Sequence, residues 1–190
     1  MGAACLPPLT TYAAAMQTVL IAAQSLDGFI TRHSEPGTAF TSPEDKAYFR
    51  RVLAGFGACL FGGETYRVSR DFIRDRLPGS ALRVVMTRSP ERYAAESIAG
   101  KLEFTNALPA ALIAGLRARG FQRCAVLGGS HIHSLFFEAG LVDEVWLTVE
   151  PVLFGGGTPL LARPAEVGLE LQAAEKLGAN TLLLHYRVVR

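Results

Sequence analysis

The sequence predicts an α/β fold in which helices cover a mostly parallel sheet, with an antiparallel hairpin at one edge. Apolar segments alternate with segments of helical periodicity along most of the 190 residues, which is typical of parallel strands joined by helices. Two apolar segments run directly into paired glycines, Gly62-Gly63 and Gly128-Gly129. The carboxyl end differs, because only residues 177–180, which include Gly178 and Asn180, separate the last two apolar segments. This spacing predicts a hairpin.

Each expected element has a local reason. Strands are expected where apolar residues run together over four to nine positions, and helices where apolar residues recur every three or four positions. In chain order, these patterns predict strand 18–23, helix 42–56, strand 58–61, helix 65–72, strand 82–86, strand 102–105, helix 108–119, strand 124–127, helix 130–139, strand 144–149 and hairpin strands 169–176 and 181–189. Residues 31–39 are polar and include Pro36-Gly37, so we expect a loop beside the first strand.

Composition indicates one globular domain over residues 17–190. Hydrophobic residues make up 49% and charged residues 19%, and the net charge is +2 with scattered Lys and Arg. This distribution argues against nucleic-acid or membrane-surface partners. No apolar run approaches the roughly 18–20 residues that span a bilayer. Residues 1–16 carry no basic segment ahead of their apolar residues, so we expect a disordered leader rather than a signal peptide.

The cysteines and histidines show no pattern of a disulfide or a metal site. Cys5, Cys59 and Cys124 are far apart, and the last two lie inside apolar runs, which favours buried reduced thiols in a cytoplasmic protein. The four histidines have no ligand spacing with the cysteines, so no metal is expected; they are His33, His131, His133 and His185.

The two glycine pairs stand where a strand passes into a helix. Glycine lets the backbone approach a ligand closely, and the first N–H groups of the helix are free to bind an anion, usually a phosphate. Two such turns in one small domain favour a ligand with several phosphates, such as a dinucleotide. The alternative is that the glycines only allow a strand and a helix to pack tightly.

Asp45 is the clearest candidate for chemistry. It follows Ser42-Pro43, a capping residue and a proline suited to a helix start, so it could simply complete a capping box. It also lies in register with Tyr48, Phe49 and Val52, on the face of the helix that packs inward. An acid at the start of an apolar stripe suits the floor of a pocket.

Several motifs resemble the dihydrofolate reductase-like family, in this order along residues 18–189. Residues 21–30 (IAAQSLDGFI) resemble its first strand and loop, residues 43–50 (PEDKAYFR) its acid-bearing helix, residues 62–66 (GGETY) its phosphate turn and residues 128–130 (GGS) its second glycine turn. Residues 139–144 (AGLVDE) and 151–160 (PVLFGGGTPL) look more like the reductase domain of riboflavin biosynthesis, the carboxyl-terminal half of a bifunctional deaminase-reductase. The resemblance implies a dihydrofolate reductase-like three-layer fold.

The resemblance further implies an NADPH-dependent reductase of a small-molecule substrate. It places Asp45 and Thr148 at the catalytic site, with Asp45 relaying a proton and Thr148 orienting it. Ala23 and Ile30 are implied to contact the nicotinamide of the cofactor, and Thr87 and Arg88 the 2′-phosphate of its adenosine. The residues implied to contact the pyrophosphate are Gly62, Thr65, Gly128, Gly129 and Ser130. Leu127 is implied as a further cofactor contact. Arg88 would favour NADPH over NADH because a guanidinium matches a phosphate.

The substrate is less clear from the motifs. Folate reductases follow Leu-Pro-Gly with an arginine that binds the folate tail, whereas Ser80 follows Leu77-Pro78-Gly79 here; Arg76 or Arg83 could substitute. The resemblance therefore favours reduction of a ribosylamino-pyrimidine phosphate, whose phosphate would bind Arg67, Arg70, Arg74 or Arg163. Dihydrofolate reduction is one alternative, because the resemblance also places Asp45 and Thr148 where folate reductases contact the pterin, and riboflavin-type reductases often lack an acid at the first of these positions. A non-catalytic nucleotide-binding role is the other alternative.

A homodimer is expected from the carboxyl-terminal hairpin. Its leucines would leave an apolar face or a free edge, and riboflavin-type relatives commonly dimerise through this region.

Overall fold

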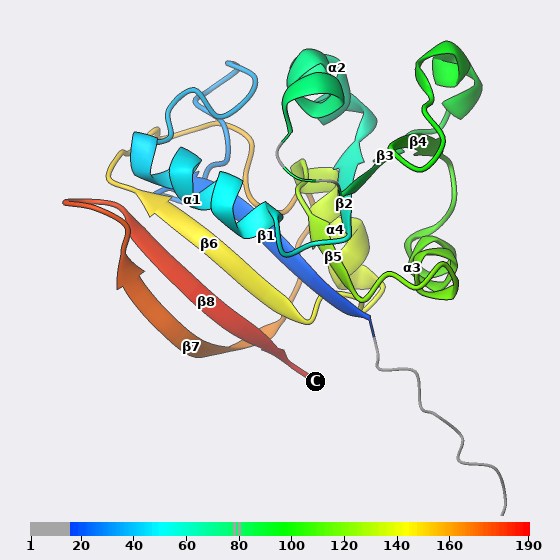
Figure 1. The fold of residues 1–190 in the computed structure, drawn as a ribbon. Helices are drawn as coiled ribbons and strands as arrows, with labels where there is room; N and C mark the ends of the chain where they lie inside the picture. Colours follow the sequence, from blue (N-terminus) through cyan, green and yellow to red (C-terminus); the bar gives the residue numbers. More distant parts are fainter. Residues whose placement is uncertain (1–15, 78, 80) are drawn as a thin grey trace, which may run out of the picture.

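A computed structural model describes residues 16–77, 79 and 81–190 of the chain (Figure 1). Its helices and strands follow the predicted order. They are β1 (Gln17–Ser25), α1 (Pro43–Leu53), β2 (Ala58–Gly62), α2 (Gly63–Asp71), β3 (Leu82–Met86), β4 (Leu102–Thr105), α3 (Pro109–Ala118), β5 (Arg123–Val126), α4 (Ser130–Glu138), β6 (Glu144–Glu150), β7 (Gly168–Lys176) and β8 (Leu182–Val189). Two short helical segments were not predicted, a π-helical turn at Phe72–Arg76 and a 3₁₀ segment at Pro90–Glu96.

The strands of the described residues form one eight-stranded sheet in the order β4-β3-β2-β5-β1-β6-β8-β7. The strands from β4 to β6 pair in parallel, and β8 and β7 then add antiparallel pairs. In Figure 1 the hairpin forms the edge of the sheet beyond β6. The predicted parallel sheet with an antiparallel edge hairpin is confirmed.

Two apolar cores separate the sheet from a layer of helices on each face. On one face Leu53 and Phe56 of the α1 region and Tyr66 of α2 pack against the strands. On the other face Leu116 of α3 and Phe136 of α4 do the same. Burial of apolar surface on both faces explains why the central strands are apolar without alternation.

The described residues revise one boundary of the sequence analysis. Met16 is 7% exposed and belongs to the core beside α3 and α4, so the folded part begins at least there. The rest of the predicted leader, residues 1–15, lies outside the described residues. So do Pro78 and Ser80, in the segment where folate reductases carry the arginine that binds the folate tail. In the part of the chain that is described, no helix is long and apolar enough to cross a membrane.

The register of the strands brings the predicted functional segments to the same end of the sheet, where the parallel strands have their carboxyl ends. Leu60 of β2 pairs with Val126 of β5, so the two glycine turns begin side by side at the carboxyl ends of these strands. Ala23 of β1 pairs with Thr148 of β6, near the carboxyl ends of the next two strands. In open α/β sheets, ligands bind just outside the carboxyl ends of the strands.

Candidate active site

The two glycine turns touch each other. The Gly62 N–H donates to the Gly128 carbonyl at 2.7 Å. A Cβ atom placed on Gly129 would lie 3.5 Å from Oγ1 of Thr65, in the first turn of α2. The N-termini of α2 and α4 therefore form one continuous surface.

Not every predicted glycine has an amide left for a ligand. The Gly62 N–H is engaged within the protein, and a Cβ there would lie 2.9 Å from Cγ1 of Ile132. Gly62 thus fits the alternative of tight packing between strand and helix. The first backbone N–H groups of a helix have no carbonyl partner within that helix. At the starts of α2 and α4, the N–H groups that follow Gly62 and Gly129 can therefore donate to an anion.

Gly128 makes room for a buried histidine that the sequence analysis did not single out. Gly128 has φ +102°, and a Cβ there would lie 2.7 Å from Nε2 of His133. His133 is 1% exposed, and its Nδ1 lies 2.9 Å from the Leu160 carbonyl, as a donor. Burial lowers the pKa of His133 to about 4, so the ring is neutral at pH 7. Its position on the inner face of α4 was the only sequence signal.

The predicted 2′-phosphate residues lie next to the first glycine turn. A Cβ on Gly63 would be 3.4 Å from Oγ1 of Thr87, which follows β3. Arg88 is exposed, and among the described residues it forms no ion pair. Its guanidinium is therefore available to a ligand.

Asp45 lies on the sheet side of α1 and is 8% exposed. Its N–H donates to Oγ of the N-cap Ser42 at 3.1 Å. The return bond of a capping box is not made by Asp45, because the Ser42 N–H donates to the carboxylate of Glu150 at 2.8 Å. The Asp45 carboxyl is thus free of the capping role that was its alternative explanation.

The surroundings of Asp45 raise the pKa of its carboxyl group. Burial is the main cause that raises its pKa above the usual value, and the negative charge of Glu150 adds to this. Hydrogen bonding from the Thr148 and Thr41 side chains and the charge of Lys46 act in the opposite direction without cancelling it. Thr148 is 2% exposed, and its hydrogen bonding lowers the pKa of Asp45.

Glu150, the last residue of β6, was missed by the sequence analysis. It is 2% exposed and accepts hydrogen bonds from Ser42 and from Thr181, which precedes β8. The available signal was alternation along the strand, because Trp146, Thr148 and Glu150 occupy one face. The expected strand ended at residue 149, one position too early.

Of the two predicted nicotinamide contacts, Ala23 lies within β1, and Ile30 lies where the loops after β1 and β6 are joined. The Ile30 N–H donates to the Thr158 carbonyl at 2.8 Å, and the Thr158 N–H donates to Oγ1 of Thr31 at 2.9 Å. The Asp27 carboxylate accepts from the Gly155 N–H at 2.7 Å. Leu127, on the neighbouring β5 side, donates its N–H to the Leu60 carbonyl at 2.9 Å and is half-buried.

The predicted site residues thus form two neighbouring groups at the carboxyl ends of the parallel strands. One group contains the glycine turns with Thr65, Thr87, Arg88, Leu127 and Ser130, at the ends of β3, β2 and β5. The other contains Ala23, Ile30, Asp45 and Thr148, at the ends of β1 and β6.

The four arginines proposed to bind a substrate phosphate each have a carboxylate partner. Arg70 pairs with Glu96 at 2.8 Å, Arg74 with Asp75 at 2.8 Å and Arg163 with Glu138 at 2.7 Å. Arg67 pairs with Glu64 one turn earlier on α2. None of the four is held ready for an anion, so their geometry singles out no phosphate anchor.

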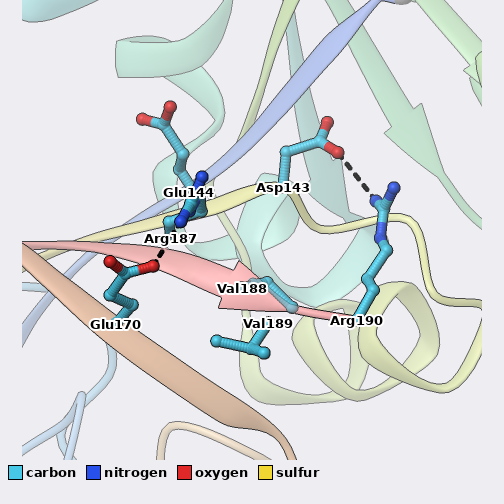
Figure 2. A pocket seen from close by; sticks show the side chains of 7 residues that line it. All are labelled: Asp143, Glu144, Glu170, Arg187, Val188, Val189 and Arg190. Atoms are coloured by element: carbon cyan, nitrogen blue, oxygen red, sulfur yellow. Dashed lines mark hydrogen bonds and ion pairs between the residues drawn. The ribbon is translucent and has the colours of Figure 1, made fainter.

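A hollow of about 410 Å³ lies at the opposite end of β6 (Figure 2). Its lining includes the ion pairs Asp143–Arg190, at 2.7 Å, and Glu170–Arg187. Because Glu144 is the first residue of β6 and Glu150 the last, this hollow is remote from Asp45. Four of its five charged side chains form these two ion pairs, and it is not part of the candidate site.

Comparisons with known proteins agree with this architecture. A model of the RibD C-terminal domain family matches residues 18–183. A Bacillus subtilis (strain 168) protein named Uncharacterized protein YwjB is 28% identical over 178 residues, which cover 90% of this chain and 97% of that protein.

Two solved structures share the fold. A putative riboflavin biosynthesis protein from Shewanella sp. PV-4 has a TM-score of 0.68 at 24% identity, over 92% of this chain and all of the other. A diaminohydroxyphosphoribosylaminopyrimidine deaminase/5-amino-6-(5-phosphoribosylamino)uracil reductase from Thermotoga maritima has a TM-score of 0.74 at 19% identity, over 92% of this chain and 57% of that one. At these identities the likeness establishes the dihydrofolate reductase-like fold alone.

Proposed function

Because the chain belongs to the RibD C-terminal domain family, we propose that it is an NADPH-dependent oxidoreductase of the riboflavin-biosynthesis type. Its substrate would be a small heterocycle or a ribosylamino-pyrimidine phosphate, as for a 5-amino-6-(5-phosphoribosylamino)uracil reductase. The observation that carries the proposal is that the buried Asp45, near Thr148 of β6, and the two touching glycine turns both lie at the carboxyl ends of the parallel strands.

The residues at the glycine turns fit NADPH. Two helix N-termini meet there and offer free amides to a pyrophosphate, and a Cβ on Gly129 would fill part of the space against Thr65. Arg88, beside Thr87, would hold the 2′-phosphate. Bound NADPH would supply a hydride to a C=N or C=O carbon of the substrate.

The protein's own part in the reaction is to hold and deliver a proton. Hydride addition to that carbon leaves an electron pair on the adjoining nitrogen or oxygen, which must take up a proton. Asp45, whose pKa is raised by burial, would deliver that proton directly or through a water or hydroxyl. Thr148 would fix the orientation of the Asp45 carboxyl.

The cofactor claim is tested by titrating the purified protein with NADPH and NADH while following fluorescence of Trp146, its single tryptophan. We expect saturation with both nucleotides and tighter binding of NADPH. Replacing Arg88 by Ala should weaken NADPH roughly 10–100-fold, the worth of a charge-assisted hydrogen bond, and leave NADH unchanged. Absence of any saturable signal would refute the cofactor assignment.

The substrate claim is tested by following NADPH oxidation with the ribosylamino-pyrimidine phosphate and, separately, with dihydrofolate. Turnover with the first supports the proposed function. Folate reduction is the second candidate, favoured by the effect of Thr148 on Asp45 at the positions implied for pterin contacts. Turnover with dihydrofolate alone would reverse the order, and silence with both would favour a non-catalytic nucleotide-binding protein.

The proposed setting is the cytoplasm. Cys59 and Cys124 are fully buried free thiols, and burial raises the pKa of Cys59 to about 12. Inert thiols of this kind suit a compartment in which cysteines stay reduced.

A further inference from the structure

Glu150 is a buried carboxylate held by donors from two distant parts of the chain. Its Oε1 accepts from the N–H and the Oγ of Ser42, both at 2.8 Å. Its Oε2 accepts from Oγ1 of Thr181 at 2.9 Å. The end of β6 is thereby tied to the start of α1 and to the residue that leads into β8.

These bonds connect Glu150 to Asp45 through the helix cap. Oγ of Ser42 donates to Glu150 and at the same time accepts from the Asp45 N–H at 3.1 Å. Glu150 thus replaces Asp45 as the acceptor of the Ser42 N–H. It also lies two positions beyond Thr148 on the strand, on the same face of the sheet.

The partners of Glu150 are all hydrogen-bond donors. The N–H and Oγ of Ser42 and the Oγ1 of Thr181 donate to its carboxyl oxygens. Ser42 is the N-cap of α1, where the positive end of the helix dipole lies. Of the groups that face Asp45, Glu150 comes from β6, Thr148 from β6 and Thr41 from the preceding loop, while Lys46 and Tyr48 come from α1.

We propose that Glu150 is a positioning residue for Asp45: it fixes the first turn of α1 against the sheet and, as a nearby negative charge, opposes ionisation of the Asp45 carboxyl. The proposal rests on the proposed function for its catalytic consequence, but its physical content does not. A buried anion beside an acid disfavours a second ionisation whatever substrate the site accepts.

Glu150→Gln is the direct test because it removes the charge and keeps the shape. The amide oxygen can still accept from Ser42, and the Thr181 hydroxyl can turn to accept from the amide nitrogen. Carbon-13 NMR of the side-chain carboxyl carbons in the full-length protein gives the titration midpoint of Asp45 in each variant. We expect a lower midpoint in Glu150→Gln than in the wild type, and no change in Glu166→Gln, an exposed control.

An unchanged Asp45 midpoint in a folded Glu150→Gln protein would overturn the proposal. Should this variant not fold, the wild-type titration still decides. Interacting carboxyls give broadened, mutually dependent curves, whereas two independent single-proton curves would contradict the inference.

Kinetics separate this proposal from the proposed function. If a substrate is turned over, the decline of kcat at high pH should move to lower pH in Glu150→Gln. Above that decline, kcat should fall roughly three- to tenfold, the scale of one partly buried charge acting on a neighbour, with KM for NADPH unchanged. A shifted NMR midpoint without turnover of any tested substrate would refute the function and support the role of Glu150.

Discussion

Asp45 and its partners show how single residues acquire their chemistry from burial. A carboxyl at a helix start is ordinarily ionised and caps the helix. Here Glu150 accepts the Ser42 N–H instead, and Asp45 is left against the sheet beside Thr148. The loss of hydration then raises the pKa of Asp45, so that it keeps its proton to a higher pH than an exposed aspartate does.

Replacing Asp45 by Asn should reduce turnover about 10²–10⁴-fold, because that is the usual contribution of a positioned general acid. NADPH affinity and the fold should be preserved, since the glycine turns are untouched. Single-turnover rates and nucleotide titration on the same protein check this. Glu44→Gln, at the exposed neighbouring position, is the matched control, and full activity in Asp45→Asn would refute the catalytic role.

His133 should make the protein sensitive to acid. Its pKa is about 4 in the folded state against 6.5 when exposed, so only the unfolded chain gains a proton as the pH falls between these values. Stability should drop by about 3 kcal/mol between pH 6.5 and 4 and level off below. Asp45 acts with the opposite sign, because its raised pKa favours the folded state as the pH falls.

A difference measurement isolates the histidine. His133→Asn keeps a donor for the Leu160 carbonyl but does not titrate. Urea unfolding at several pH values should show that the wild type loses its advantage over this variant across that range. Parallel pH curves for the two proteins would be inconsistent with a buried neutral His133.

At the scale of elements, the glycine turn between β5 and α4 contains one glycine that packing requires and one that leaves space for a ligand. Gly128 is confined by its positive φ and by His133, whereas Gly129 has room for a methyl group near Thr65. Adjacent glycines therefore have different physical reasons to be glycine.

Alanine at each position should separate these reasons. Gly128→Ala should lower the free energy of unfolding by about 2–4 kcal/mol, from overpacking and left-handed strain. Gly129→Ala should change stability little but weaken NADPH roughly tenfold or more, because a methyl group would stand where phosphate meets the amides. Melting temperatures and nucleotide titration provide the readout. The assignment fails if Gly128→Ala is as stable as the wild type.

At the scale of the whole molecule, the hairpin leaves apolar surface uncovered. β7 is the edge of the sheet, and Leu169, Leu171, Leu182 and Val189 are 43%, 52%, 40% and 55% exposed. An open strand edge with exposed leucines favours pairing with another chain, which supports our proposal of a two-fold homodimer.

Light scattering at micromolar concentration should therefore give twice the 20.4 kDa mass of the chain. Leu171→Glu should shift the mass toward the monomer, because it places a charge in the proposed interface. Leu108→Glu is the control, since Leu108 is 75% exposed at the start of α3. A monomeric wild type would exclude the homodimer.

The sequence by itself determined the order of the elements, the edge hairpin, the two glycine turns and the inward face of α1. These features depend on hydrophobic periodicity and on the conformational freedom of glycine, which act between residues close in the chain. The family motifs lie in the same short stretches, so the order of the residues is enough to identify them.

Only the tertiary structure decided which groups are partners. Ser42 and Glu150 are 108 positions apart, and their contact depends on where α1 crosses the end of β6. Three further contacts also depend on how distant elements pack. They are the hydrogen bond from the Gly62 N–H to the Gly128 carbonyl, the contact of buried His133 with the Leu160 carbonyl and the Arg163–Glu138 ion pair. Strand register and helix placement are set by packing over the entire core, so no local pattern specifies them.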